Sequence, residues 1–132
     1  MAKAPEDLDE IYRSLKSLLV EFETPRPGVV FEGRSASDKD FDLWLVRDLV
    51  IEGRSRKELY FAGIRLQSSF VGFYFFPVYC LPSLAASFAP GLMKLLKGKS
   101  CFRVKSLEGG LRDQIREALI LGLDGYRDRG WA

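Results

Sequence analysis

The chain contains no histidine among its 132 residues. Histidine is the commonest general base and transition-metal ligand, and it is the usual side chain that titrates near neutral pH. Cysteine is scarce as well, because Cys80 and Cys101 are the two in the chain and they form no CxxC motif. A zinc site would need both thiols plus carboxylates, which is an uncommon ligand set. The sequence therefore predicts no cofactor.

A strong net charge and a long apolar run are also absent. The 20 basic and 18 acidic side chains leave a formal charge of +2, which is too balanced to favour nucleic acid or an anionic membrane as a partner. The longest apolar stretch, 70–84, is interrupted by Gly72, Pro77 and Pro82, so it does not read as a membrane span. Two lone thiols without a recognisable signal peptide favour a reducing cytoplasm over a Cys80–Cys101 disulfide.

What is present is typical of one soluble globular domain spanning 1–132, with 47% hydrophobic and 29% charged residues. We expect residues 1–4 to form a loose terminus. Apolar residues recur at three- and four-residue spacing from Pro5 to Thr24 and from Leu107 to Tyr126, which predicts an amphipathic helix in each segment. In the second helix, either Ile120 or Tyr126 completes the apolar stripe.

Between these helices the pattern predicts mostly strands. The predicted elements are a short strand Val29–Phe31, a strand Phe41–Asp48, a turn Gly53–Arg56, a hairpin of Lys57–Leu66 and Ser69–Phe76, a helix Pro82–Leu96 broken or restarted at Pro90, and a strand Ser100–Lys105. Strands flanked by terminal amphipathic helices predict an α+β fold, in which an antiparallel sheet packs against the N- and C-terminal helices as a two-layer sandwich.

Five aromatic rings lie between Phe70 and Phe76. This density predicts a strand that is apolar on both faces. Helices on one side of the sheet would cover only one of those faces. The other face would line a pocket or an oligomer interface, and a homodimer is one way to cover it.

Gly98-Lys99-Ser100 invites comparison with a nucleotide phosphate loop, but two requirements fail. Met93 stands where that loop needs a glycine, and a strand pattern follows where it needs a helix. The surrounding basic residues indicate either a solvated rim or a contact for an anion, such as a phosphate or a partner's carboxylate. They are Lys94, Lys97, Lys99, Arg103 and Lys105.

The aromatic strand and this basic turn together give the candidate ligand-binding residues. The set consists of Tyr74, Pro77, Tyr79, Lys99, Ser100, Cys101 and Arg103. The aromatic members are equally explained as core rings whose hydroxyl groups reach the surface. Cys101 beside basic residues could be a reactive thiol, although a small buried strand residue explains it better.

Carboxylates gather at the start of the first predicted helix, where they could bind a divalent cation weakly. Matching of the helix dipole and solubility explain them more simply. The residues are Glu6, Asp7, Asp9 and Glu10.

Residues Leu59 to Tyr126 resemble the YdhG-like family of small bacterial domains of unknown function. The resemblance is carried by Phe61-x-Gly63, by Ser69–Tyr74 running into Pro77-Val78-Tyr79, by Pro90-Gly91-Leu92 and, most specifically, by Gly98-Lys99-Ser100-Cys101-Phe102-x-x-Lys105. It implies an antiparallel sheet packed against the terminal helices, with a distant likeness to frataxins in shape and an iron-chaperone role proposed for some members. It implies no catalytic residues.

The sequence thus predicts a cytoplasmic, non-enzymatic binding or interaction module for a small molecule or a protein, with neither nucleic acid nor membrane as partner. Two alternatives remain open. One is a weak iron- or divalent-cation-binding chaperone that uses the acidic first helix, and the other is an enzyme with Cys101 as nucleophile.

Overall fold

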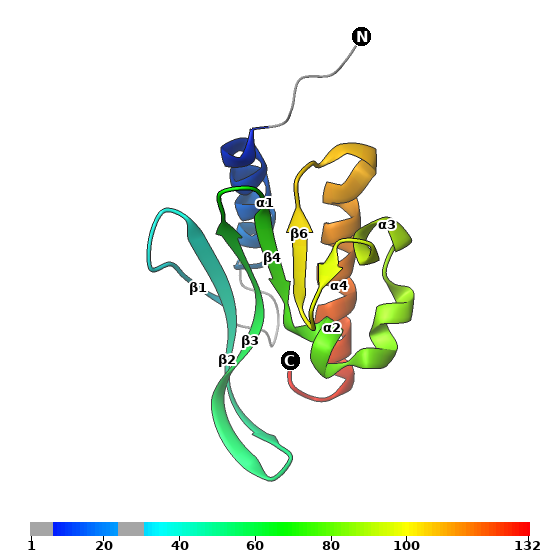
Figure 1. Ribbon diagram of the computed structural model, residues 1–132. Helices are drawn as coiled ribbons and strands as arrows, with labels where there is room; N and C mark the ends of the chain where they lie inside the picture. The colour runs from blue at the N-terminus through cyan, green and yellow to red at the C-terminus, as the bar shows by residue number, and fades with distance from the viewer. Residues whose placement is uncertain (1–6, 24–30) are drawn as a thin grey trace.

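The computed structural model describes residues 7–23 and 31–132, and this part of the chain forms a six-stranded antiparallel sheet with long helices from its two ends (Figure 1). Helix α1 (Leu8–Glu23) and helix α4 (Leu111–Asp128) lie on the same face of the sheet. The predicted α+β sandwich is confirmed. Two predictions fall outside the described residues. They are the loose terminus at 1–4 and, in the first predicted strand, Val29 and Val30.

The strands are ordered β1-β2-β3-β4-β6-β5, and every neighbouring pair is antiparallel. Their bounds are β1 Phe31–Arg34, β2 Asp40–Ile51, β3 Arg54–Leu66, β4 Val71–Phe75, β5 Leu96–Lys97 and β6 Cys101–Val104. The long hairpin of β2 and β3 projects beyond the rest of the sheet (Figure 1). Between β4 and β5 the chain passes around α4 through three short helices, α2 Phe76–Cys80, η1 Pro82–Ser87 and α3 Pro90–Met93.

The two long helices run side by side in the same direction (Figure 1). The Arg112 side chain of α4 donates from Nε to the Ser14 hydroxyl oxygen of α1 at 2.9 Å, and Arg116 pairs with Glu21 at 3.4 Å. Helix α4 is also tied to the sheet, because the Tyr126 hydroxyl donates to the backbone carbonyl of Tyr60 at 2.6 Å. Tyr126 is fully buried, whereas Ile120 is exposed, so Tyr126 completes the apolar stripe.

The core is centred on Phe61 of β3. Its ring stacks on Phe31 with 4.7 Å between centroids and meets the rings of Phe75 and Tyr126 edge-on at 5.6 and 5.4 Å. An irregularity in the β2–β3 register makes this possible, because Leu43 pairs with Ala62 while Trp44 pairs with Tyr60. Phe61 is therefore an extra residue, a β-bulge, and both it and the adjacent Ala62 are fully buried.

The prediction of an aromatic strand that is apolar on both faces is wrong. Strand β4 ends at Phe75, and Phe76 begins α2 because Pro77 suits the first turn of a helix. Within β4 the side chains alternate, so that Val71, Phe73 and Phe75 enter the core while Gly72 and Tyr74 face away from the helices. Phe73 and Phe75 are fully buried, so the core beside them is closed. The argument for a homodimer from this strand therefore loses its basis.

Two further predictions need correction. The turn predicted at Gly53–Arg56 is a two-residue turn at Glu52 and Gly53, both with positive φ (51° and 77°), and β3 already begins at Arg54. The sequence predicts a helix over Pro82–Leu96 that is broken or restarted at Pro90, and a helix does restart there, because α3 begins at Pro90. Its first part is the 3-10 helix η1, however, and its end, Leu96, belongs to the strand β5.

Gly122 allows α4 to approach the sheet, and substituting it tests this packing. A Cβ at Gly122 would lie 2.5 Å from the Phe75 ring and 3.0 Å from Pro77. Helix propensity alone favours Gly122→Ala by about 1 kcal/mol, but overpacking against a buried ring opposes it by about 1–3 kcal/mol. We expect Gly122→Ala to lower the free energy of unfolding measured in urea.

Gly125→Ala in the same helix is the matched control. A Cβ at Gly125 would face the ends of the Leu81 and Leu84 side chains, which can move more readily than a ring held on all sides. It should therefore destabilise the protein less than Gly122→Ala does. Equal or greater stability of the Gly122→Ala protein relative to wild type would contradict the close packing of α4.

Candidate functional site

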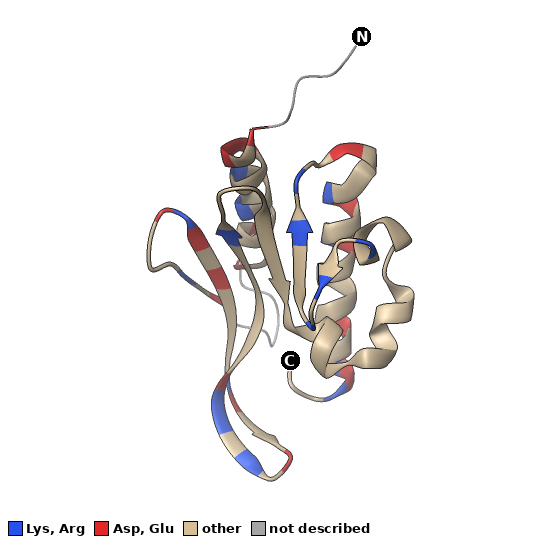
Figure 2. Ribbon diagram, in the orientation of Figure 1, with Lys and Arg blue, Asp and Glu red and all other residues tan. Residues whose placement is uncertain are grey.

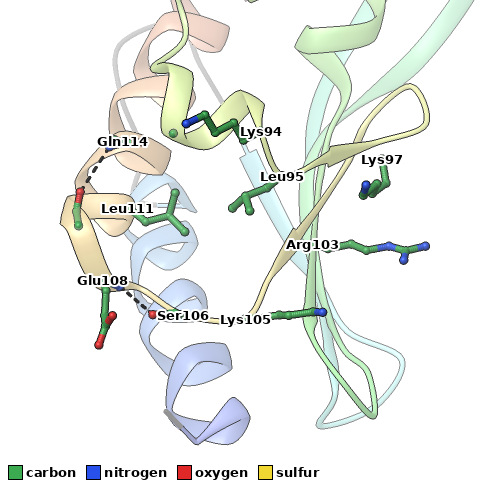
Figure 3. A pocket seen from close by; sticks show the side chains of 11 residues that line it. Lys94, Leu95, Lys97, Arg103, Lys105, Ser106, Glu108, Leu111 and Gln114 are labelled. Carbon is green, nitrogen blue, oxygen red and sulfur yellow. Dashed lines mark hydrogen bonds between the residues drawn. The ribbon is translucent and has the colours of Figure 1, made fainter. Parts of the chain in front are cut away.

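A pocket of about 590 Å³ lies where the end of β6 faces the segment after α3 and the start of α4 (Figure 3). Its walls come from one stretch of the chain, 91–114, which runs from α3 through β5 and β6 to the start of α4. The lining residues are Gly91, Lys94, Leu95, Lys97, Arg103, Lys105, Ser106, Glu108, Gly109, Leu111 and Gln114.

Four of these lining residues are basic. Lys94 follows α3, Lys97 ends β5, Arg103 belongs to β6 and Lys105 comes directly after β6. The alternation of β6 explains the last two, because Phe102 and Val104 enter the core and so turn Arg103 and Lys105 to the opposite face. The predicted concentration of positive charge is therefore divided, because Lys97, Arg103 and Lys105 project from the open face of the sheet and Lys94 lies on the other side (Figure 3). The Arg103 guanidinium lies over the Phe70 ring, 5.0 Å from its centroid.

The charged groups are arranged unevenly around the pocket. The side chains of Lys97, Arg103 and Lys105 extend in the same direction, away from α4, while Lys94 lies on the other side (Figure 3). Glu108 is the acidic residue among the lining residues, and its side chain points away from these basic groups (Figure 3). Figure 2 shows the same concentration of basic residues along β5 and β6.

The inner wall of the pocket combines apolar groups with one amide. Leu95 and Leu111 point toward each other between the sheet edge and α4 (Figure 3). The Gln114 side chain donates from Nε2 to the Gly109 carbonyl at 3.5 Å, which orients the amide. Its Oε1 is buried and has no hydrogen-bond partner among the described residues. Sequence reasoning missed Gln114, since a glutamine in an amphipathic helix carries no signal of such a position.

Of the predicted ligand-binding residues, Arg103 alone lines this pocket. Lys99 instead lies over the Tyr79 ring, with Nζ 5.3 Å from the ring centroid. Pro77 is buried beside Gly122, and the backbone carbonyl of Ser100 accepts a hydrogen bond from the Phe75 N–H at 2.9 Å.

Tyr79 lines a second, separate groove of about 720 Å³ between α2, the β2–β3 hairpin and the C-terminal residues. Tyr79 and Val50 are the most exposed of its large apolar side chains, at 48% and 70%. Arg56 and Arg129 add positive charge, and Glu52 adds negative charge, at this groove.

Tyr74 and Cys101 are cross-strand neighbours on the face of the sheet that no described helix covers. Burial, and then contact with Cys101, raises the pKa of the Tyr74 hydroxyl. Arg65 lies over the Tyr74 ring at 5.3 Å and approaches Asp42 at 3.8 Å. The Arg65 guanidinium thus covers the Tyr74 ring on this face.

A second arginine covers an aromatic ring on this open face of the sheet. Arg34 lies over the Trp44 ring at 5.2 Å, and Trp44 meets Tyr60 edge-on at 5.1 Å. The Tyr60 hydroxyl donates to Asp42 Oδ1 at 2.8 Å. Burial, and then the Asp42 carboxylate, raises the pKa of Tyr60. Gly63 makes room for this pair, because a Cβ there would overlap both groups.

Asp7, one of the four residues of the predicted acidic site, has a structural role at the start of α1. Asp7 caps α1 by accepting a hydrogen bond from the Asp9 N–H at 2.9 Å. Glu6 lies outside the described residues. Within residues 7–23 and 31–132, no three His, Cys, Asp or Glu side chains are grouped closely enough to hold a metal ion.

The fold and the pocket define a class: a two-layer α+β domain that carries a basic pocket at one edge of its sheet. Comparison with family models, curated proteins and solved structures found no match to the chain. The resemblance to the YdhG-like family therefore stays a prediction. In the described part of the chain, every helix is too short or too polar to cross a membrane.

Both cysteines are free thiols, and their surroundings differ. Burial raises the pKa of Cys80 from 9.0 to about 11, with the nearby Tyr126 hydroxyl opposing the shift. At pH 8 a thiol with the higher pKa carries roughly a hundredfold less thiolate, which is the reactive form. We expect Cys80 in a Cys101→Ser protein to react with iodoacetamide at least that much more slowly than in the same protein unfolded in urea. Equal rates would show that Cys80 is not held in this buried position.

Proposed function

We propose that the protein is a non-enzymatic binding module that takes an anionic group at the edge of its sheet, at the basic cluster of Lys97, Arg103 and Lys105. One observation carries this proposal: these three cationic side chains extend in the same direction from β5, from β6 and from the residue after β6, and Glu108, the carboxylate among the residues that line the adjoining pocket, points away from them (Figure 3). Convergent charge of one sign in a concave site raises the local concentration of the opposite charge.

The scale of the pocket agrees with this proposal. Ligand pockets usually measure about 300–1,000 Å³ and combine apolar walls with a few polar groups. This pocket has about 590 Å³ and includes Leu95, Leu111 and the Gln114 amide. Free thiols favour a reducing compartment for its action.

A binding role is favoured over catalysis by the absence of histidine and by the surroundings of the two cysteine thiols. The chain has no histidine to act as a base. The Cys101 thiol contacts the Tyr74 hydroxyl, and Cys80 is held with a raised pKa by burial. Neither thiol lines the basic pocket.

Titration with inorganic phosphate and pyrophosphate, followed by amide chemical shifts, tests the proposal. We expect shifts concentrated at 94–97 and 103–106, with pyrophosphate binding more tightly because it carries more charge. Lys97→Glu together with Arg103→Glu should weaken binding at least tenfold, because two attractive charges become repulsive.

The matched control is Arg47→Glu with Lys57→Glu, which changes the net charge equally on the projecting hairpin. This control should bind both anions within about twofold of wild type, at an ionic strength near 0.15 M where distant charges are screened. Equal weakening by both double variants would show a general charge effect and no site. Absence of binding to wild type would contradict the proposed function.

A further inference from the structure

Strand β3 loses its second partner where the chain of β4 turns away from the sheet. Strand β4 pairs with β3 over Ala62–Leu66, and its chain then leaves the sheet at Phe76 to form α2. Over Arg54–Leu59, β2 is the one strand among the described residues that pairs with β3. Alternate residues of a strand that is paired on one side direct their N–H and C=O groups away from that partner. This edge of β3 can therefore accept another strand.

The groove of about 720 Å³ lies beside this free edge, because Arg56 and Leu59 of β3 are among the residues that line it. Its other walls come from the hairpin tip, from α2 and from the C-terminal residues. The groove has large apolar side chains that are exposed or partly buried, and these are Val50, Phe76, Tyr79 and Trp131. A strand added to β3 would thus meet side chains as well as backbone, and side-chain contacts give strand addition its specificity.

The charge beside this edge is mainly positive. Figure 2 shows basic residues gathered on the projecting part of the hairpin. The acidic residue that lines the groove is Glu52, at the hairpin turn, and Glu58 of β3 is already paired with Arg34. The exposed basic residues are Arg54, Arg56 and Lys57 of β3 and Arg129 after α4. Such an edge repels a basic strand and attracts an acidic one.

Beyond the anion site at the other end of the sheet, we propose that this groove binds an extended acidic peptide segment of another protein as a strand added to β3. Main-chain hydrogen bonds to Arg54–Leu59 hold the peptide. Its carboxylates meet Arg56 and Arg129, and an apolar side chain contacts Tyr79. A second copy of the protein fits this edge less well, because two copies of the basic strand would bring like charges opposite each other.

Fluorescence anisotropy with two labelled heptapeptides tests the charge requirement. One peptide alternates glutamate with valine and the other alternates lysine with valine, so both favour an extended strand and they differ in the sign of their charge. We expect the glutamate peptide to bind the wild type at least tenfold more tightly than the lysine peptide. Equal binding of the two peptides would overturn the inference of an acidic partner.

N-methylation of every second amide in the glutamate peptide tests the strand pairing on the unaltered protein. Alternate amides of an added strand face β3 or point away from it, so methylating one set removes the hydrogen bonds to β3 and methylating the other set leaves them. We expect one methylated peptide to bind at least tenfold more weakly than the unmethylated peptide, and the other to bind within about threefold of it. Equal loss in both methylated peptides, or loss in neither, would overturn the added strand.

Arg56→Glu together with Arg129→Glu should weaken binding of the glutamate peptide at least tenfold. The matched control is Lys97→Glu with Arg103→Glu, which changes the net charge equally at the anion site. This control should bind the peptide within about twofold of wild type at an ionic strength near 0.15 M. Equal weakening by both double variants would show a general charge effect and overturn the inference.

The remaining outcomes separate this inference from the proposed function. If neither peptide binds to the wild type, the inference is overturned and the anion site is unaffected. If the glutamate peptide does not bind and sedimentation shows a dimer that Arg56→Glu with Arg129→Glu dissociates, the edge pairs with a second copy and the inference is overturned. Loss of phosphate binding with retained peptide binding would contradict the proposed function alone.

Discussion

The packing of other rings around Phe61 is the contact on which the rest of the molecule depends. Phe61 lies on β3, and its neighbours come from α1, β1, β4 and α4, namely Phe22, Phe31, Phe75 and Tyr126. One side chain thus joins both terminal helices to the sheet. The β-bulge that frees Phe61 from strand pairing turns it and Ala62 to the covered face together. Aromatic pairs of this geometry add about 0.5–1.5 kcal/mol each beyond their burial.

The same packing explains where a ligand site can form. Helix α4 is fixed by Tyr126 near its end and by the close approach of Gly122 to Phe75, so its first turn is held beside the last strands of the sheet. Strand β5 has only two residues and leaves the end of β6 uncovered by a strand. Alternation along β6 then turns Arg103 and Lys105 to the open face of the sheet at this edge. The proposed anion site follows from a rigid core and a short edge strand.

Local pattern predicted much of this fold. Helical spacing located α1 and α4, and the strand predicted at Phe41–Asp48 lies within β2. The sequence could not show that Phe76 leaves the sheet, because a proline closes a strand and opens a helix equally well. It placed five basic residues in one short stretch, but it could not show that Lys99 lies over the Tyr79 ring or that Lys94 lies on the other side from Lys97, Arg103 and Lys105. Those distinctions depend on contacts between distant segments.

Native-state amide hydrogen exchange of the wild type and a Phe61→Leu protein tests most directly whether this ring cluster unites the fold. The account predicts that the slowest amides of α1, β3 and α4 share one free energy of opening in the wild type. It predicts that Phe61→Leu lowers that free energy in all three elements together by about 1–2 kcal/mol, as expected for the loss of a small buried apolar volume. A loss confined to β3, with α1 and α4 unchanged, would contradict it.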